Sequence, residues 1–289
     1  MASHFKQACR AAFERVLPSA ARRRAFKKTD QAFAKGAPSH AAIPDGLEAE
    51  LFLLNRFIGS GAPFEGKAFI DVGANAGEYA HVASRYLPPE KIWAFEPQSG
   101  YASRLRRLFP RVHVVQAALS DHSGHASLKV PLIKGAEYRT RGTLEHFSEP
   151  GESGAMTEDV QLMTFDEVRR GSVSAGTTTG IIGPVGCIKI DVEGHEKAVL
   201  AGMQETLSKD KPVLIIEIEQ RHHAQPIRSI FGWLAERGYD GYFYDRQAKA
   251  FKAAVGADLA KLQDPALFKT PRYIQNFVFV PRSSGASLI

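Results

Sequence analysis

The sequence predicts a Rossmann-like α/β fold: a doubly wound, mostly parallel sheet with helices on both faces and a C-terminal antiparallel hairpin. Three observations lead to this prediction. Short apolar segments alternate with helical segments between residues 67 and 237, and a loop with two glycines joins the first strand to the first helix. The last strand-like segments are aromatic and β-branched, with no clear helix between them. Such alternation is typical of parallel strands covered on both faces.

The elements follow one another in a regular order. We expect strands at residues 67–72, 91–95, 112–117, 185–190 and 212–218. We expect helices at residues 78–86, 99–109, 195–208 and 226–237. The strand segments are continuous apolar runs, which indicates burial on both faces of the sheet. Segments 241–244 and 273–280 predict the antiparallel hairpin at one sheet edge.

The chain is expected to divide into a basic helical extension with a linker, residues 1–45, and one large domain, residues 46–289. A helix at 47–58 is expected to pack on that domain. Residues 131–183 interrupt the rhythm with many Gly, Ser and Thr, and only 160–163, followed by a short helix, resemble regular structure. A polar insertion of this kind is where substrate-binding loops usually lie. A surface elaboration without a role is the alternative, which the sequence leaves open.

Composition and targeting signals limit the class of protein. Of the 289 residues, 44% are hydrophobic and 24% are charged, which argues against disorder throughout the chain. No apolar run approaches the roughly 20 residues of a membrane span, and the N-terminus lacks the apolar stretch of a signal peptide. The two cysteines, Cys9 and Cys187, form neither a disulfide framework nor a zinc motif. We therefore expect a cytoplasmic protein.

The positive charge of the chain is unevenly placed. Residues 1–40 hold nine Lys and Arg but only two acids, whereas the remaining chain is nearly neutral. A solvated helical extension explains this segment best, and attraction to an anionic membrane surface, a glycolipid or a nucleic acid is the alternative. Because no nucleic-acid motif accompanies the charge, we expect no nucleic-acid partner. The sequence does not reveal the oligomeric state.

The loop Asp71-Val-Gly-Ala-Asn-Ala-Gly77 follows the first strand and opens a helix. Glycine lets the backbone turn tightly and approach a ligand, and helix amides then face that ligand. The loop lacks the G-x-G-x-x-G pattern of dinucleotide sites and carries an acid before its first glycine. A carboxylate would serve a pyrophosphate poorly but would attract an ammonium group. The contrast favours S-adenosylmethionine over a nicotinamide cofactor.

Two further strand ends carry polar residues. Glu96 ends the second strand, 19 residues after Gly77, near the spacing at which an acid meets the diol of an adenosine ribose. Ser120 and Asp121 follow the third strand, where the adenine side of the crevice lies in a doubly wound sheet. Both could bind the base, and both are equally well explained as turn residues.

The segment Ile188-Lys-Ile-Asp-Val-Glu-Gly-His-Glu196 brings titratable groups to the same sheet edge. Methyl transfer to a hydroxyl requires removal of its proton, and Asp191, Glu193 and His195 are candidates for the base. Glu217, at the end of the next strand, is a further candidate for contact with the acceptor. Asp191, His195 and Glu217 could also hold a divalent metal, which we do not favour because no tight ligand spacing supports it.

These motifs together resemble the FkbM-type methyltransferase family over residues 64–281. The resemblance rests on residues 70–79, Phe95-Glu-Pro97, Ala118-Leu-Ser-Asp121 and, most specifically, residues 188–196. Residues 215–218 and 276–281 are also similar to that family, while Thr164-Phe-Asp166 departs mildly from its usual Thr-Leu-Asp. The resemblance implies the class I methyltransferase fold and S-adenosylmethionine-dependent O-methylation of sugars, glycolipids, polysaccharides or related natural products.

The sequence thus predicts an O-methyltransferase with a small-molecule, carbohydrate or glycolipid acceptor. Two alternatives are an NAD(P)-linked oxidoreductase and a non-catalytic S-adenosylmethionine-binding protein. The candidate catalytic residues are His195, Asp191, Glu193 and Glu217. The candidate cofactor-binding residues are Asp71, Gly73, Ala74, Asn75, Gly77, Tyr79, Glu96, Ser120, Asp121 and Asp191. No metal ligand is assigned.

Overall fold

A computed structural model describes residues 24–34, 48–59, 64–171, 182–268 and 270–284. The expected linker at 36–46, the first 23 residues and the Gly/Thr-rich stretch at 176–180 lie outside the described residues. Within the part of the chain that is described, no helix is both long and apolar enough to cross a membrane.

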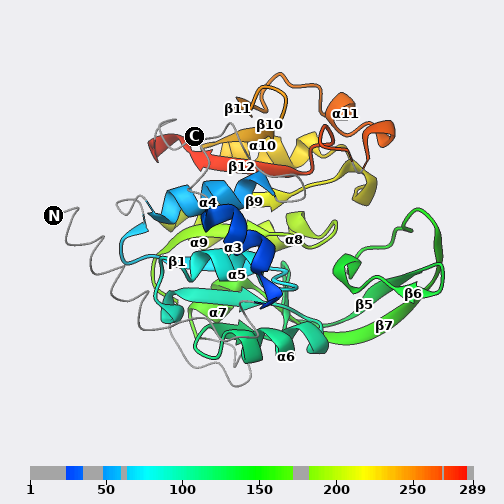
Figure 1. The fold of residues 1–289 in the computed structure, drawn as a ribbon, viewed down its shortest axis with the longest axis horizontal. Helices are drawn as coiled ribbons and strands as arrows, with labels where there is room; N and C mark the ends of the chain where they lie inside the picture. Colours follow the sequence, from blue (N-terminus) through cyan, green and yellow to red (C-terminus); the bar gives the residue numbers. More distant parts are fainter. Residues whose placement is uncertain (1–23, 35–47, 60–63, 172–181, 269, 285–289) are drawn as a thin grey trace.

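The main sheet has eight strands in the order β11-β10-β12-β9-β8-β1-β2-β3 (Figure 1). Five of them pair in parallel: β1 Ala68–Val72, β2 Ile92–Phe95, β3 His113–Val115, β8 Val185–Ile190 and β9 Val213–Glu217. The strand order reverses between β1 and β8: the chain continues from β1 to β2 and β3 on one side of this pair, and from β8 to β9 on the other. A crevice opens at the carboxyl ends of strands at such a point.

Helices cover both faces of the sheet, because the side chains of each strand alternate between two cores. Ile70 faces one core and Phe69 the other, and both are fully buried. The core of Ile70 is closed by α7 Phe165–Arg169, α8 Glu196–Ala201, α9 Gln204–Asp210 and α10 Arg228–Glu236. The core of Phe69 is closed by α3 Lys27–Ala34, α4 Ala49–Gly59, α5 Glu78–Ala83 and α6 Ser99–Leu108. The predicted α/β class is confirmed.

The single helix expected at 195–208 is instead two helices, α8 and α9, separated at Gly202. A Cβ at Gly202 would lie 1.9 Å from the carbonyl oxygen of Ser120, so only glycine permits this close approach of two chain segments. The spacing of the apolar residues predicted helical structure correctly, but the break between α8 and α9 depends on the contact of Gly202 with Ser120, which is distant in the sequence.

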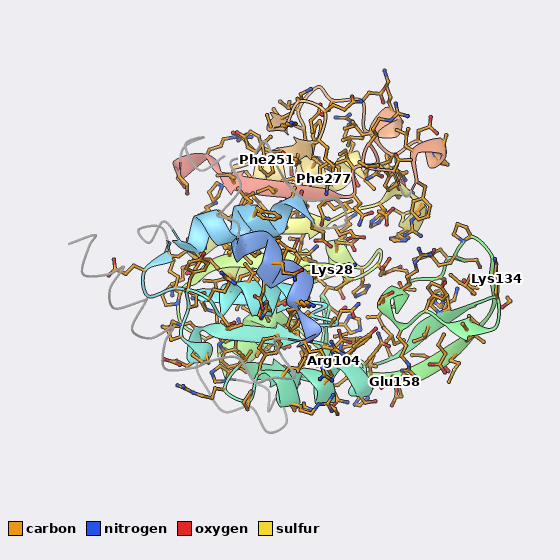
Figure 2. The ribbon with its side chains drawn as sticks, viewed as in Figure 1. Lys28, Arg104, Lys134, Glu158, Phe251 and Phe277 are labelled. Atoms are coloured by element: carbon orange, nitrogen blue, oxygen red, sulfur yellow. The ribbon has the colours of Figure 1, made fainter. Side chains whose placement is uncertain are left out.

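The polar insertion is more regular, and begins earlier, than the sequence indicated. A second sheet has the order β4-β7-β5-β6, with β4 Ala118–Leu119, β5 Gly124–Ile133, β6 Ala136–Glu137 and β7 Glu152–Met163. We call residues 124–163 the arm. Figure 1 shows it extending away from the main sheet, and Figure 2 places Lys134 at its far end.

The arm escaped prediction because most of its strand residues face solvent. Leu128, Val130, Val160 and Leu162 are buried in a small cluster of their own, whereas most of the remaining positions in β5 and β7 are exposed or half-buried. Without a continuous buried face, the strands lack the apolar pattern by which a strand is recognised. The predicted segment 160–163 is only the last third of β7.

The C-terminal strands pair as expected but occupy a different place. β12 Asn276–Pro281 is antiparallel to β10 Tyr239–Asp245, yet it also pairs with β9 and lies inside the sheet. The edge is formed by β11 Ala250–Ala253, the hairpin partner of β10, and the short helix α11 Leu259–Leu262 lies between β11 and β12. All six residues of β12 are buried, which explains its apolar composition.

The described part of the basic extension is attached to the domain through α3. The ring of Phe26 stacks on His81 of α5, with ring centroids 4.3 Å apart. Asp30 lies 2.8 Å from His81 Nε2 and accepts a hydrogen bond from Arg85 at 3.2 Å. The predicted division at residues 45 and 46 stays a prediction.

Candidate functional site

A pocket of about 560 Å³ lies at the carboxyl ends of β1, β2 and β8, where the strand order reverses. Three strand ends and the arm contribute to its wall. The predicted residues that line it are Gly73, Asn75, Glu96, Asp191, Glu193 and His195. The arm adds Leu128, Thr140, Gly142 and Leu144.

The loop after β1 is shaped by two glycines with positive φ, and each has a packing reason. At Gly73, with φ +75°, an added Cβ would lie 1.8 Å from the carbonyl oxygen of Asp191. At Gly77, with φ +90°, it would lie 2.6 Å from Leu105 of α6. Gly73 lines the pocket, whereas Gly77 and Ala74 do not. Gly73 therefore lets the ends of β1 and β8 approach closely at the crevice, whereas Gly77 lets the start of α5 pack against α6.

Glu96 holds the loops after β1 and β2 together at the pocket wall. Its carboxylate accepts hydrogen bonds from the amide of Asn75 at 2.8 Å and from the amide of Gln98 at 2.9 Å. Burial raises the pKa of Glu96 to about 7, although both amide bonds act to lower it. The carboxylate therefore gains strongly from any ligand that adds hydrogen-bond donors.

Three buried oxygens at the pocket lack a hydrogen-bond partner among the described residues. They are Asn75 Oδ1, Gln98 Oε1 and Glu193 Oε2, and all three residues line the pocket. All three atoms are acceptors, so the pocket suits a ligand that brings N–H or O–H donors or positive charge. An anionic pyrophosphate would leave these atoms unpaired.

Asp71 and Tyr79 lie behind the pocket wall and do not line it. The Asp71 carboxylate is 2% exposed and accepts a hydrogen bond from the amide of Ala80 at 3.1 Å. Burial raises its pKa to about 7, while the ammonium of Lys189 acts to lower it. The Tyr79 hydroxyl donates to Glu48. Direct contact of either residue with a cofactor stays a prediction.

Lys189 lies fully buried behind the same wall. Its ammonium donates to Asn276 Oδ1 at 3.0 Å and lies 3.9 Å from a carboxylate oxygen of Asp191. Burial acts to lower the pKa of Lys189, but the surrounding carboxylates, Asp191 first, raise it above its usual value. Lys189 therefore remains charged and offsets part of the negative charge beside the pocket.

His195 sits between two polar partners at the pocket. Its Nδ1 lies 2.6 Å from the Glu145 carboxylate, and its Nε2 lies 3.0 Å from the Ser120 hydroxyl. The His195 hydrogen bond lowers the pKa of Glu145, so this carboxylate is an acceptor and Nδ1 is the donor. Ser120 is fully buried and its hydroxyl also lies 3.2 Å from Asp121; neither residue lines the pocket.

Asp191, Glu193 and Glu217 form an acidic cluster, with one oxygen from each within 4.8 Å of the others. Burial raises all three pKa values, that of Asp191 to about 6, and the negative charges of neighbouring acids raise them further. His195 does not belong to this cluster, so the set named from sequence as a potential metal site is not brought together. Glu217 does not line the pocket.

A second charged network ties the arm to the main sheet. Arg221, in the 3-10 turn Gln220–His222, binds Glu149 of the arm at 2.6 Å and also binds Glu219 through two hydrogen bonds. Thr143 of the arm donates to the carbonyl of Glu193 at 2.7 Å. Burial acts to raise the pKa of Glu149, but hydrogen bonds from His222 and Arg221 lower it to about 2. These contacts fix the arm segment that carries Glu145 against the pocket.

The sequence did not identify Gln98, Glu145, Glu149 or Arg221. Gln98 follows Glu96 by two residues, so the rule that sites lie at strand ends could have found it. Glu145 and Glu149 lie in an irregular part of the arm, where no periodicity indicates which side chains face the pocket.

The arm also contacts α6. Figure 2 shows Glu158 of the arm near α6, and its carboxylate accepts a hydrogen bond from the amide of Ser99 at 2.9 Å.

Comparisons with known proteins bear on the activity. Residues 71–240 match the model of the methyltransferase FkbM domain. Methyltransferase sdnD of Sordaria araneosa is 27% identical over 192 residues, which cover 59% of this chain and 73% of that protein. The 31-O-demethyl-FK506 methyltransferase FkbM of Streptomyces tacrolimicus is 30% identical over 157 residues, which cover 48% of this chain and 60% of that protein.

Solved structures with similar folds include two methyltransferases. The FkbM methyltransferase of Methylobacillus flagellatus is 14% identical, with a TM-score of 0.43 over 88% of this chain and 59% of that one. An O-methyltransferase of Bacillus cereus, solved with S-adenosylhomocysteine (SAH), is 12% identical, with a TM-score of 0.42 over 96% of this chain and 98% of that one. The family model, by contrast, spans more than half of the chain and includes both the β1 loop and the β8 segment. The chain therefore belongs to the FkbM methyltransferase domain family.

Proposed function

We propose that this methyltransferase uses S-adenosylmethionine (SAM) to methylate a hydroxyl group, with His195 as the general base. The observation that carries the proposal is the set of buried acceptor atoms at the pocket: Asn75 Oδ1, Gln98 Oε1 and Glu193 Oε2. SAM carries an ammonium and a ribose diol, which together supply the hydrogen-bond donors that these atoms lack. The residues present therefore fit this cofactor.

Glu96 and Asn75 would hold the adenosyl part of the cofactor. A carboxylate can accept both hydroxyl protons of a ribose, and Glu96 is held at the pocket wall by two backbone amides. Apolar side chains from β2, β4 and the arm, namely Phe95, Ala118, Leu119 and Leu128, would face the adenine. When bound, SAM supplies a methyl group on a sulfonium sulfur, which keeps the electron pair of the broken bond as the acceptor oxygen takes the methyl.

His195 is the best-placed base at the pocket. Its Nδ1 is held by Glu145, which leaves Nε2 with the lone pair that accepts a proton. The Ser120 hydroxyl lies 3.0 Å from Nε2, so a hydroxyl of the acceptor must replace this contact before Nε2 can take its proton. Asp191 and Glu193 carry raised pKa values and lie at the same pocket, so they are second candidates for the base.

The acceptor we propose is a hydroxylated sugar, glycolipid, polysaccharide or related natural product. The arm supports an acceptor with polar groups, because it adds Thr140, Gly142 and Leu144 to the wall of the pocket. The name of the Streptomyces relative gives 31-O-demethyl-FK506 as the acceptor of that protein. A nucleic-acid partner is not expected.

A methyl-transfer assay with isotope-labelled SAM tests the proposal. Monosaccharides, glycolipids and demethylated macrolides serve as acceptor probes, and mass spectrometry of the product locates the methyl on oxygen. We expect His195→Ala to lose at least 100-fold in kcat while calorimetry shows unchanged SAM affinity. Full turnover by His195→Ala would contradict the role of the base. Tight SAM binding with no transfer to any probe would favour the non-catalytic alternative.

A further inference from the structure

The arm contributes a residue to the reaction machinery as well as a wall to the pocket. Glu145 lies on the irregular segment between β6 and β7, and its carboxylate lies 2.6 Å from Nδ1 of His195. The His195 side chain is 14% exposed and that of Glu145 40% exposed. A pair this close beside a pocket has a definite chemical consequence for the imidazole.

We propose that Glu145 is a positioning residue that fixes the tautomer of His195, with the proton on Nδ1 and the lone pair on Nε2. This inference rests on the proposed function, in which His195 accepts the hydroxyl proton. A neutral imidazole has one N–H, and a carboxylate accepts a hydrogen bond but cannot donate one. The proton therefore stays on Nδ1, and the lone pair stays on Nε2.

The position of Glu145 is itself held from both sides. The amide of Glu145 donates to the hydroxyl of Thr143 at 3.0 Å, and that hydroxyl donates to the carbonyl of Glu193 at 2.7 Å. Four residues further along the arm, Glu149 is bound by Arg141 and Arg221. The segment that presents Glu145 is thus fixed to the β8 loop at one end and to the 3-10 turn after β9 at the other.

The order Ser120–His195–Glu145 also matches the hydroxyl–imidazole–carboxylate order of a serine hydrolase. The structure argues against that use. Ser120 is fully buried and does not line the pocket, so an ester could not reach its oxygen. Ser120 instead meets Nε2 from behind the wall, and it holds the ring in the plane that Glu145 sets.

Long-range 1H–15N NMR of the histidine-labelled protein bound to SAH reads the tautomer of His195 without any acceptor. We expect the wild type to carry the proton on Nδ1. Glu145→Leu should shift the ring toward the Nε2–H form, which is preferred by a free imidazole. The matched control is Glu137→Leu, which removes an exposed arm carboxylate that pairs only with Arg139 among the described residues.

In the transfer assay, Glu145→Leu should lower kcat by about 10- to 100-fold, with the KM for SAM unchanged. Glu137→Leu should keep both the tautomer and the rate of the wild type. An Nε2–H tautomer in the wild type, or an unchanged tautomer in Glu145→Leu, would overturn the inference. The expected tautomers in a protein that methylates no probe would leave the role of Glu145 intact and refute the proposed function instead.

Discussion

Replacing Glu96 with Gln should weaken the binding of SAM and, at the same time, change how the stability of the protein depends on pH. The carboxylate is 3% exposed, and its pKa is raised from 4.5 to about 7. Ionising it in the free protein is therefore unfavourable, whereas the ribose of the cofactor needs the ionised form. One substitution thus acts both on the pH dependence of stability and on binding.

The stability effect follows from the raised pKa. A carboxyl group whose folded pKa exceeds its unfolded value favours the folded state at low pH, and this contribution is lost as pH rises from 4.5 through 7. At about 1.4 kcal/mol per pKa unit, the buried charge costs roughly 3 kcal/mol at pH 8. Gln carries no charge, but its NH2 group replaces one of the two oxygens that accept from the amides of Asn75 and Gln98, which costs about 1–3 kcal/mol at any pH. The variant should therefore be less stable than the wild type at pH 5, and this deficit should disappear at pH 8.

The loss of the Glu96 charge also affects the binding of SAM. A hydrogen bond to a charged group contributes about 1.5–3 kcal/mol, and each 1.4 kcal/mol is tenfold in Kd, so losing one bond weakens binding at least about tenfold. Near pH 6 only about a tenth of Glu96 is ionised, so wild-type affinity should fall about tenfold between pH 8 and pH 6. The carboxyl groups of Asp71 and Asp191 have pKa values of about 7 and about 6, so they also change charge between pH 6 and pH 8. The contribution of Glu96 is therefore the difference between the pH dependence of Kd in the wild type and that in the variant.

Differential scanning calorimetry of the ligand-free protein and titration calorimetry with SAM at pH 6, 7 and 8 measure the two effects. Glu90→Gln is the matched control. Glu90 lies just before β2, the strand that Glu96 follows, its side chain is well exposed, and its carboxylate lies 3.9 Å from Arg111. A Glu96→Gln protein that binds SAM as tightly as the wild type, with the same pH slope, would refute the assignment of Glu96 to the cofactor.

Three further outcomes are expected. Gly73→Ala should lose several kcal/mol of stability and its SAM binding, because the new Cβ would meet the carbonyl of Asp191 at 1.8 Å. Circular dichroism and calorimetry measure the two effects, and a fold and an affinity equal to those of the wild type would contradict this expectation. Arg221→Leu should lower the free energy of unfolding by about 3–5 kcal/mol in urea at pH 7, because it removes the partner of the buried carboxylates of Glu149 and Glu219. This loss of stability should shrink as pH falls toward the Glu149 pKa of about 2. Transfer activity should survive dialysis against EDTA, because Lys189 and Arg221 already lie 3.9 and 4.0 Å from the acidic cluster; activity restored only by Mg²⁺ or Mn²⁺ would show that a metal is needed.

The strand ends of the main sheet could be predicted from the sequence because their pattern is local. Glu96 and His195 each follow an apolar run that can only be a buried strand, and parallel strands bring their carboxyl ends to one edge. The same reasoning placed Asn75 and Asp191 at the pocket. It did not show that the Asp71 carboxylate lies behind the loop and meets the Ala80 amide, because strand periodicity does not indicate which way a side chain at a strand end turns.

The sequence by itself determined the fold class, the family and the polar residues at the ends of β1, β2 and β8. It could do so because a glycine turn or an apolar strand can be recognised from a few consecutive residues. Only the tertiary structure decided that Glu145 completes the His195 pair, that Arg221 holds the arm, and that β12 lies inside the sheet. These depend on contacts between segments up to 72 residues apart, as between Arg221 and Glu149, which carry no local signature because each partner alone is an ordinary polar residue in a loop.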